Sequence, residues 1–548
     1  MRFFCLLTFL FLSSFLSITH AQIGVNHNKP EREEWLKDAG FGMFIHWNVD
    51  TQLGVVISHS LVGASPDYIE RYISELPKTF DPKDWDPERL VILAKNAGMQ
   101  YIMFTTKHHA GFCMWDTKTT DFGVMNTPYK KDIVRQYVDA CRKWGLAVGF
   151  YYSPEDFSFA YRNGMKDLTR DDHWEKAKPF QAKYKQFVEA QCKELMTNYG
   201  PVDLFFIDSD VLREEVKATV WKYQPNCLVT RGVLQTPEQY LPGETLSSAW
   251  ESCMTMGTAW NYKPTNDHYK SGTELINILI ESRAKGGSYL LNVGPTQWGQ
   301  LNEGQQGRLM EIGAWHFINQ EAVHDVRPWI VRNEGDIWLT KSKDGNTVYA
   351  YITNMPEWPR GERRNFLLRS IKTTANTEVS VLGQSGNVVE YKPDLDGKTR
   401  FKQTPEGIEI SVVRAQRIYN NHKWPNPVVV KFKNVAPALE PTQFRTVKAE
   451  KLPNGNLRLL ANVLKLGHGK NYRIGFEYRP VQSSLNEEFN QKWTSTDIYP
   501  ISKTGEQSLE IVGSNIQSYD EIEYRAVLIQ DGLKIEGDTQ KISKLRLE

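Results

Sequence analysis

Leu204-Phe205-Phe206-Ile207-Asp208 is the stretch that decides the fold, since a carboxylate directly ends a continuous apolar run. A short run of this kind is typical of a strand that is covered on both faces in a parallel sheet. A carboxylate in such a place must be paired, bind a metal or face a polar cleft, because an isolated buried charge is costly. Asp208 is therefore the first candidate functional residue, with a buried ion pair as the alternative.

Further apolar runs lie on both sides of this stretch, and segments with helical hydrophobic spacing separate them. We expect strands at residues 41–47, 101–107, 147–153, 202–208, 227–231, 249–254 and 288–293. We expect helices at residues 132–144, 180–198 and 272–284, among others. The alternation of strands and helices predicts an α/β fold, a (β/α)8-like TIM barrel over residues 22–330.

Beyond the barrel the pattern changes to short alternating strands, such as those expected at 347–353, 377–382 and 408–413. Alternation with polar turns predicts a β-sandwich, which we place at residues 331–425. A proline-rich join leads to residues 426–548, whose pattern resembles a second sandwich of fibronectin or immunoglobulin type. Neither sandwich shows a group of acids, bases or metal ligands, so packing, spacing and sugar binding stay open as their roles.

The N-terminal residues 1–21 are typical of a secretory signal peptide. Arg2 precedes an apolar run over residues 3–16, and Thr19-His20-Ala21 supplies the small residues that a signal peptidase needs. The alternative is a buried helix, and the run is too short for a membrane span. We expect a secreted protein, periplasmic or extracellular, and the absence of any Asn-x-Ser/Thr sequon favours bacterial export.

Composition narrows the classes of partner. The chain has 66 Lys and Arg against 65 Asp and Glu, a net charge of +1, with no long block of one sign. Nucleic acid binding needs a basic stripe, so it is excluded as a main function. The 16 Trp and 24 Tyr suit both a protein core and the apolar faces of sugar rings. No other segment predicts a membrane span, and we expect no cofactor.

In a parallel barrel the active site lies at the C-terminal ends of the strands. Polar residues at the ends of the expected strands are His46, His108, His109, Tyr151, Tyr152, Asp208 and Arg231. Any one of them alone is more often a structural hydrogen-bonding group, but several strand ends with such groups indicate a site. Asp208 is the sharpest case among them, because it ends a continuous apolar run.

Glycoside cleavage needs two carboxyl groups, one that attacks or stabilises the anomeric carbon and one that protonates the leaving oxygen. Two glutamates follow Arg231. Glu238 lies in an expected loop, and loop placement suits a proton donor that must reach the substrate. Glu251 lies inside an expected strand and is the runner-up. The alternative for either glutamate is a solvated or ion-paired side chain.

Several motifs occur in a fixed order along the chain. They are Phe-Ile-His-Trp at 44–47, Lys-His-His-Ala-Gly-Phe at 107–112, Tyr-Tyr-Ser at 151–153, Phe-Ile-Asp at 206–208, Trp-Glu at 250–251 and Gly-Gly-Ser-Tyr-Leu-Leu-Asn-Val-Gly-Pro at 286–295. The ordered set, over residues 31–329, resembles glycoside hydrolase family 29, the α-L-fucosidases.

The resemblance implies an exo-acting retaining hydrolase in which Asp208 attacks the anomeric carbon and Glu238, in a Thr-x-Glu loop, is the acid/base. It implies a fucosylated glycan or another carbohydrate as the partner. The sugar pocket that it implies consists of His46, His108, His109, Tyr152 and Arg231, with Tyr151 less favoured, and of Phe206 and Trp260 around the C6 methyl group.

Three departures from the family pattern lie close to the implied pocket. Ala110 stands where the family commonly has an aspartate, so a supporting carboxylate is missing. Ser209 and Asp210 follow the nucleophile where glycine is usual, and Asp210 is a candidate replacement or third acid. Arg71 takes the place of a pocket-wall tryptophan. A linked or acidic fucoside, or another sugar, therefore stays open as the substrate.

Two other functions compete with this hypothesis. A metal-dependent barrel hydrolase would use His46, His108, His109 and Asp208 as ligands. Against it, neighbouring histidines on a strand point to opposite faces, and no HxH or HExxH motif is present. We therefore expect no metal. A non-catalytic secreted sugar-binding protein is the second alternative, motivated by Ala110 and the appended sandwiches, although both candidate carboxyl groups are present.

Overall fold

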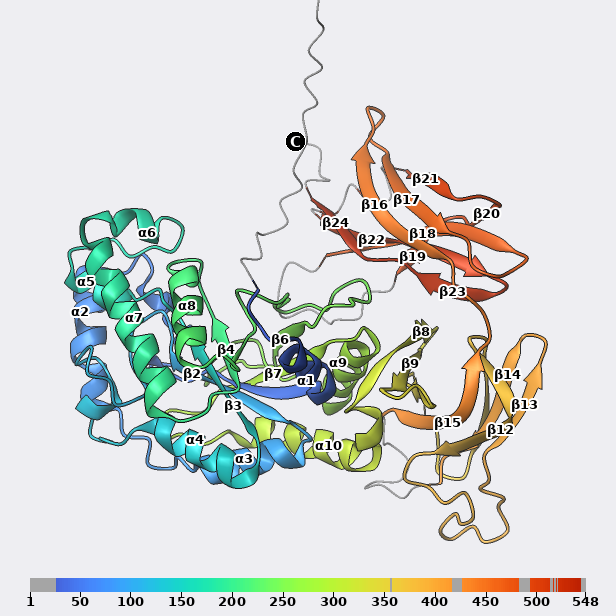
Figure 1. Ribbon diagram of the computed structural model, residues 1–548, viewed down its shortest axis with the longest axis horizontal. Helices are drawn as coiled ribbons and strands as arrows, with labels where there is room; N and C mark the ends of the chain where they lie inside the picture. Colours follow the sequence, from blue (N-terminus) through green and yellow to red (C-terminus); the bar gives the residue numbers. More distant parts are fainter. Residues whose placement is uncertain are drawn as a thin grey trace, which may run out of the picture.

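The computed structural model describes residues 26–354, 357–415, 426–481, 493–512, 516, 519 and 521–543. A barrel lies on one side of the molecule and two β-sandwiches lie on the other (Figure 1). The predicted fold class, a (β/α)8-like barrel followed by β-sandwiches, is confirmed. The predicted signal peptide, residues 1–21, lies outside the described residues.

Parallel strands form the barrel sheet in the order β5-β4-β3-β2-β1-β7-β6. These strands are β1 Phe41–Ile45, β2 Tyr101–Lys107, β3 Ala147–Tyr152, β4 Leu204–Ile207, β5 Leu228–Val229, β6 Glu251–Thr255 and β7 Ser288–Val293. The helices around them are α1 Pro30–Ala39, α2 Pro66–Ser74, α3 Pro87–Asn96, α4 Ile133–Trp144, α5 Phe157–Arg162, α6 His173–Lys176, α7 Gln181–Asn198, α8 Arg213–Tyr223, α9 Gly272–Ala284 and α10 Glu303–Asn319. Each strand overlaps its predicted range.

An irregular segment lies alongside β6, where a regular barrel has its remaining strand. The carbonyl oxygens of Gln235 and Pro237 accept hydrogen bonds from Glu251 and Cys253 of β6, at 3.1 and 3.0 Å. The Gln239 amide donates to the Cys253 carbonyl at 2.9 Å. This segment carries Glu238 and fixes its backbone directly beside the barrel wall.

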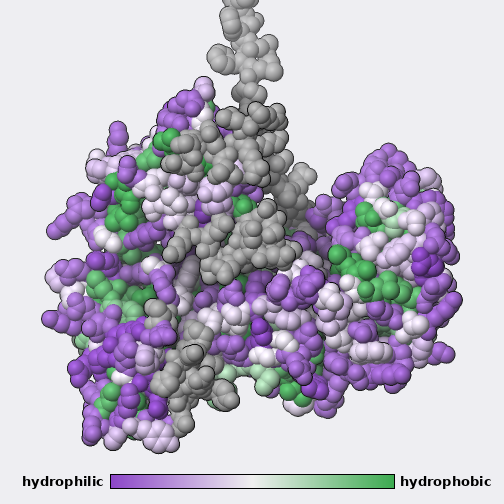
Figure 2. Space-filling model, turned by 180° about the vertical axis from the view of Figure 1, so that it is seen from behind, coloured by the Kyte–Doolittle hydropathy of each residue, from purple (hydrophilic) through white to green (hydrophobic). Residues whose placement is uncertain are grey.

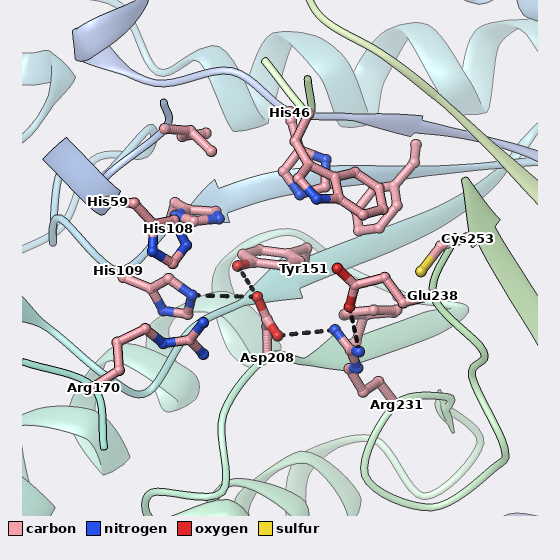
Figure 3. Close-up of a pocket in the computed structure, with 14 residues that line it drawn as sticks. His46, His59, His108, His109, Tyr151, Arg170, Asp208, Arg231, Glu238 and Cys253 are labelled. Atoms are coloured by element: carbon pink, nitrogen blue, oxygen red, sulfur yellow. Dashed lines mark hydrogen bonds and ion pairs between the residues drawn. The ribbon is translucent and has the colours of Figure 1, made fainter. Parts of the chain in front are cut away.

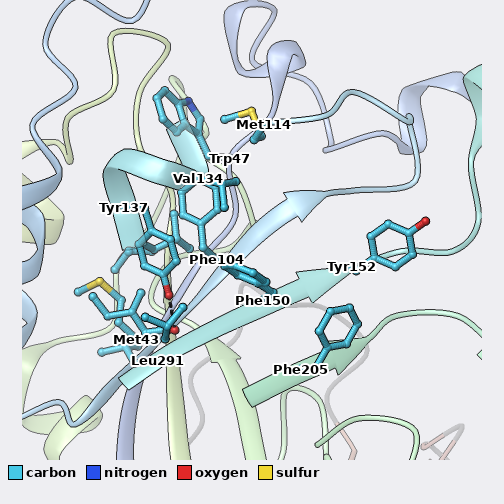
Figure 4. Packing of buried hydrophobic residues seen from close by; sticks show 14 of the residues in the cluster. Met43, Trp47, Phe104, Met114, Val134, Tyr137, Phe150, Tyr152, Phe205 and Leu291 are labelled. Atoms are coloured by element: carbon cyan, nitrogen blue, oxygen red, sulfur yellow. Dashed lines mark hydrogen bonds between the residues drawn. The ribbon is translucent and has the colours of Figure 1, made fainter. Parts of the chain in front are cut away.

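Side chains alternate between the barrel interior and the layer under the helices, as the period of a strand requires. Tyr151 of β3 pairs with Phe206 of β4 in register, and both belong to the cluster inside the barrel. Their neighbours Tyr152 and Phe205 lie in the outer layer, with Phe104 of β2 (Figure 4). Both layers are buried, so the strand sequences show no alternation of polar and apolar residues.

The first sandwich has a five-stranded sheet, β12-β15-β10-β9-β8, and a three-stranded sheet, β11-β14-β13. Its strands are β8 Val326–Glu334, β9 Ile337–Ser342, β10 Thr347–Ile352, β11 Arg363–Leu368, β12 Ile371–Val381, β13 Arg400–Thr404, β14 Gly407–Val413 and β15 Val428–Pro437. Strand β15 hydrogen bonds to β10 and β12. The sheet therefore continues beyond the boundary expected at residue 425, and the join to the next domain follows Pro437.

The second sandwich has the sheets β16-β17-β21 and β19-β18-β22-β23, with β20 paired to β18 and β24 to β22. Its strands are β16 Gln443–Lys451, β17 Leu457–Lys465, β18 Tyr472–Pro480, β19 Thr494–Ser495, β20 Tyr499–Ile501, β21 Gly505–Ile511, β22 Glu521–Gln530, β23 Leu533–Glu536 and β24 Gln540–Ser543. Buried residues such as Leu459, Ile474 and Phe476 fill the space between the sheets.

Arg332 of β8 connects the three domains. Its Nη1 donates to the Gly243 carbonyl of the barrel at 2.6 Å, and its Nη2 donates to the Gly537 carbonyl of the second sandwich at 3.1 Å. Gly243 lies in the loop that follows Glu238, so the sandwiches support the side of the barrel that carries this glutamate.

The outer surface is mainly hydrophilic on the face that Figure 2 shows, and hydrophobic residues form only small groups on it. Within the part of the chain that the structure describes, every helix is too short or too polar to cross a bilayer.

Candidate active site

A pocket with a cavity volume of about 170 Å³ opens at the C-terminal ends of the barrel strands. Its lining includes the predicted polar residues His46, His108, His109, Asp208, Arg231 and Glu238 (Figure 3). The predicted aromatic residues Phe206 and Trp260 also line it. The volume is well below the roughly 300–1,000 Å³ of sites for drug-sized ligands, so it suits a single sugar ring.

Asp208 follows β4 and is held by three side chains. The Tyr151 hydroxyl donates to Oδ2 at 2.5 Å, Arg231 Nη1 donates to Oδ1 at 3.0 Å, and His109 Nε2 lies 3.5 Å from Oδ2. Burial alone would raise the pKa of Asp208, but the electrostatic interactions with His109 and Arg231 and the tyrosine hydrogen bond lower it to about 2. Asp208 is therefore an ionised carboxylate at neutral pH.

Glu238 lies on the other side of Arg231 from Asp208. Arg231 Nη2 donates to Glu238 Oε2 at 2.6 Å, so one guanidinium binds both carboxyl groups (Figure 3). This bridge keeps the carboxyl groups close together, as retaining glycosidases require with a separation of roughly 5–5.5 Å. The Glu238 side chain is 39% exposed against 19% for Asp208, so Glu238 is the carboxyl group with better access to solvent.

The structure places Tyr151 in the pocket and Tyr152 outside it, the reverse of the preference stated from sequence. Tyr152 is fully buried in the layer under the helices, where its hydroxyl donates to Gln191 of α7 at 2.8 Å. Tyr151 points into the barrel because it shares the face of Phe206 and Asp208. The register of β3 against β4 decides which tyrosine faces the site.

Each predicted histidine of the pocket has its own hydrogen-bond partner. His46 Nδ1 pairs with Asn292 Oδ1 at 2.6 Å, His108 Nδ1 with Ser58 Oγ at 2.9 Å, and His109 Nδ1 with Ser153 Oγ at 2.6 Å. Burial lowers the pKa of His46 to about 4 and that of His109 to about 3, and it lowers the pKa of His108 well below its usual value. The rings are therefore neutral at pH 7 and can exchange hydrogen bonds with sugar hydroxyls.

Ser58 is a supporting residue that sequence reasoning missed. Its Oγ also accepts a hydrogen bond from the Ala110 amide at 2.8 Å, and its own amide donates to buried Asp50 at 2.6 Å. Its φ of +56° lies in the left-handed region, which is uncommon for a residue other than glycine. The contacts with Asp50 and His108 hold this strained residue and orient the imidazole without the aspartate that Ala110 replaces.

The pocket has an apolar wall formed by Phe44, Phe206 and Trp260. The ring centroids of Phe44 and Phe206 are 5.1 Å apart, and those of Phe44 and Trp260 are 6.1 Å apart. Arg231 Cζ lies 5.1 Å from the Phe206 ring centroid. This wall can take a methyl group where it would leave a hydroxyl without a partner.

Glu251, the runner-up acid, does not line this pocket. It is fully buried as the first residue of β6, and the Tyr101 hydroxyl donates to its Oε2 at 2.5 Å. Burial raises the pKa of Glu251 to about 7. The raised pKa therefore results from burial at the end of the barrel interior that lies away from the pocket. A substrate in the pocket does not reach Glu251 there.

The other departures from the family pattern also lie outside the pocket. Arg71 is on the outer face of α2, half exposed and paired with Asp67 at 2.9 Å. Asp210 is 88% exposed and paired with Arg213. The expected effect of Arg71 on the pocket wall and the expected role of Asp210 as a third acid are therefore wrong.

Three further residues shape the site, although sequence reasoning did not select them. Arg170 lines the pocket from a loop, and His59 lines it from the start of a short 3-10 helix. Glu155, which is 2% exposed, lies behind His109, with Oε2 3.4 Å from Nδ1 of that ring. Glu155 follows β3 by three residues, so the rule that polar residues at strand ends form the site would have found it. No pattern marks the loop that carries Arg170.

Among the described residues, His108, His109 and Asp208 offer ligand atoms that lie within 4.8 Å of one another. Both imidazoles face the pocket because they follow the end of β2, so the argument that neighbouring histidines point apart does not hold here. However, Arg231 contacts the same carboxylate at 3.0 Å. A guanidinium in that place repels a dication, so the group suits sugar binding better than a metal.

Two carboxyl groups on one guanidinium, at the C-terminal end of a parallel barrel and beside neutral imidazoles, define the class of retaining barrel glycosidases. The model of the alpha-L-fucosidase family matches residues 22–321. The chain belongs to the alpha-L-fucosidase family.

Relatives with curated descriptions are similar over most of their length. The chain is 28% identical over 406 residues to the tissue alpha-L-fucosidase of Mus musculus, which covers 66% of this chain and 86% of the relative. It is 26% identical over 367 residues to the alpha-L-fucosidase of Dictyostelium discoideum, and the match covers 59% of this chain and 78% of the relative.

Solved structures share the fold. Alpha-L-fucosidase isoenzyme 1 from Paenibacillus thiaminolyticus has a TM-score of 0.58 at 25% identity and covers 74% of this chain and 98% of its own. The alpha-L-fucosidase from Vibrio sp. strain EJY3 has a TM-score of 0.64 at 20% identity, and the match covers 95% of this chain and 93% of the Vibrio chain. The second match extends over both sandwiches as well as the barrel.

Proposed function

We propose that the protein is an exo-acting α-L-fucosidase that hydrolyses fucosides from glycans with retention of configuration. The observation that carries the proposal is the pair of carboxyl groups bridged by Arg231, with Asp208 ionised and Glu238 nearer to solvent. Family membership supports it, and the small pocket suits a terminal sugar rather than an internal one.

In the first step an Asp208 oxygen attacks the anomeric carbon as the bond from that carbon to the leaving oxygen breaks. Glu238 gives its proton to the leaving oxygen, which departs as an alcohol, and the sugar becomes an ester of Asp208. Tyr151 and Arg231 stabilise the carboxylate before attack, each through a different oxygen, and the partner of the oxygen that does not react still holds it afterwards.

In the second step the Glu238 carboxylate takes a proton from a water molecule whose oxygen attacks the same carbon. The bond to Asp208 breaks and the carboxylate is restored. Two inversions give net retention. Glu238 suits both steps because it is exposed enough to meet an aglycone and then water.

Hydrolysis of an aryl α-L-fucoside by the wild type and by Asp208→Ala tests the proposal. The wild type should release L-fucose, and loss of the nucleophile should lower kcat by at least about 10⁴-fold. A panel of aryl glycosides of other sugars tests the sugar, and preference for a sugar without the C6 methyl group would contradict the assignment. Activity that is lost with EDTA and restored with zinc would instead favour a metal hydrolase.

We also propose that residues 1–21 direct export and are removed, which gives a periplasmic or extracellular enzyme. The apolar run over residues 3–16 and the small residues before Gln22 support this. N-terminal sequencing of the exported protein should begin at Gln22. A mature protein that begins at Met1 and stays in the cytoplasm would contradict the proposal.

A further inference from the structure

We propose that Arg170, His59 and His109 form an anion subsite, which binds a sulfate or phosphate ester on a ring hydroxyl of the fucosyl group. The inference rests on the proposed function and deepens it, since it assigns a charged substituent to the sugar in the same pocket.

Arg170 reaches the pocket from the loop between α5 and α6, outside the barrel strands. It lies next to His109, on the opposite side of Asp208 from Glu238 (Figure 3). His59 begins a short 3-10 helix between β1 and α2, and its ring centroid lies 5.5 Å from that of His109. These two segments therefore bring a guanidinium and a second imidazole to the end of the pocket beside His109.

The positive charge of Arg170 has little compensation from the protein. Its Nε donates to Glu155 Oε2 at 3.3 Å, and among the described residues its Nη1 and Nη2 have no hydrogen-bond partner. Burial raises the pKa of Glu155 to about 7, so this partner is only partly ionised at neutral pH. Asp208 is the other nearby acid, but Arg231 and Tyr151 already bind both of its oxygens.

The chemistry of fucose restricts what an anionic group here can be. Its C6 atom is a methyl group, so the ring cannot carry a uronate carboxylate, and the remaining sites are hydroxyls that can form esters. Neutral imidazoles already suffice for unmodified hydroxyls. A guanidinium with two free ends matches the oxygens of a sulfate or phosphate, which it binds with paired hydrogen bonds.

The arrangement assigns the anion to the sugar and not to the aglycone. Glu238 must face the leaving oxygen, so the aglycone leaves the pocket on that side of Asp208. Arg170 lies on the other side, beside the imidazole that contacts Asp208. Phe206 of the apolar wall lies 5.1 Å from Arg231 Cζ, on the side of Asp208 opposite Arg170, so the methyl group lies away from the anion subsite.

The test compares kcat/KM for an aryl α-L-fucoside with its 2-, 3- and 4-O-sulfated and phosphorylated forms. The wild type should cleave at least one ester about tenfold better than the neutral fucoside, and Arg170→Gln should lower that ratio by about 10–100-fold. Arg170→Lys should keep part of the preference. Arg71→Gln removes the same charge outside the pocket and should leave the ratio unchanged.

A fucoside with a carboxylate on the aryl group tests whether the anion subsite binds a charge on the aglycone instead. If this compound shows the Arg170-dependent preference and the ring esters do not, the assignment to the sugar is overturned. Equal ratios in the wild type and Arg170→Gln would overturn the anion subsite as a whole.

Calorimetry separates this inference from the proposed function. Fucose sulfate should bind the wild type more tightly than fucose, with the difference lost in Arg170→Gln. Cleavage of the neutral fucoside without any preference for esters would contradict the anion subsite but not the proposed function. If no fucoside, neutral or esterified, is cleaved, the proposed function fails and this inference falls with it.

Discussion

Tyr151 donates a 2.5 Å hydrogen bond to Asp208, from the strand next to the one that the aspartate follows. A hydrogen bond to a carboxylate stabilises its charged form, so this contact keeps Asp208 ionised. The pKa of the tyrosine is itself raised by burial and by the charge of Asp208, so it stays a donor throughout the pH range of catalysis.

Replacing each tyrosine of β3 by phenylalanine tests which of them acts in the pocket and which only stabilises the core. Tyr151→Phe should lower kcat/KM by about 10–100-fold, because a hydrogen bond to a charged group is worth about 1.5–3 kcal/mol. Tyr152→Phe should leave kcat/KM unchanged and reduce stability by about 1 kcal/mol through the lost contact with Gln191. Steady-state kinetics and thermal unfolding check both, and equal loss of activity in the two variants would contradict the geometry.

Azide distinguishes the two candidate acids. Glu238→Ala should lower kcat/KM for a fucoside with a poor leaving group by about 10²–10⁴-fold, the usual contribution of acid/base catalysis. Azide should restore part of the rate with an activated aryl fucoside, because the small anion enters where the carboxylate was, and a fucosyl azide should form. Glu251→Ala is the matched control, and rescue of that variant instead would show the assignment to be wrong.

Glu251 should make stability depend on pH. Because its pKa is raised to about 7 in the folded protein, the folded state holds a proton that the unfolded state loses above about pH 4.5. Stability therefore falls as pH rises towards 7, by about 3 kcal/mol at the alkaline limit. Glu251→Gln removes this loss.

Thermal unfolding of the wild type and Glu251→Gln from pH 5 to pH 9 measures the effect. The difference in Tm, variant minus wild type, should grow with pH, since Glu155 and Asp50 titrate equally in both proteins. A difference that is constant or shrinks with pH would mean that Glu251 is not a buried neutral acid.

The apolar wall should set the preference for the methyl group. Trp260→Ala opens space next to Phe206, so the enzyme should discriminate less between L-fucosides and L-galactosides, which carry a hydroxyl on C6. The ratio of their kcat/KM values should fall by about tenfold, within the range for a single small group in an apolar pocket. An unchanged ratio would place the methyl group elsewhere.

The barrel and the two carboxyl groups of its pocket could be predicted because the evidence for them is local. Asp208 ends an apolar strand, and Glu238 follows an arginine that ends another. The choice between Tyr151 and Tyr152 could not be made, since both faces of β3 are buried and only the register with β4 decides which one faces the pocket. Arg170 was missed for a different reason, because a loop outside the strands carries it to the site.

The residue that carries the covalent intermediate tests the central claim most directly. After reaction with 2-fluoro-fucosyl fluoride, mass spectrometry of the digested protein should find one fluorofucosyl adduct, on the peptide and at the position of Asp208, and none in Asp208→Asn. An adduct on Glu238 or Glu251 in the wild type would contradict the account.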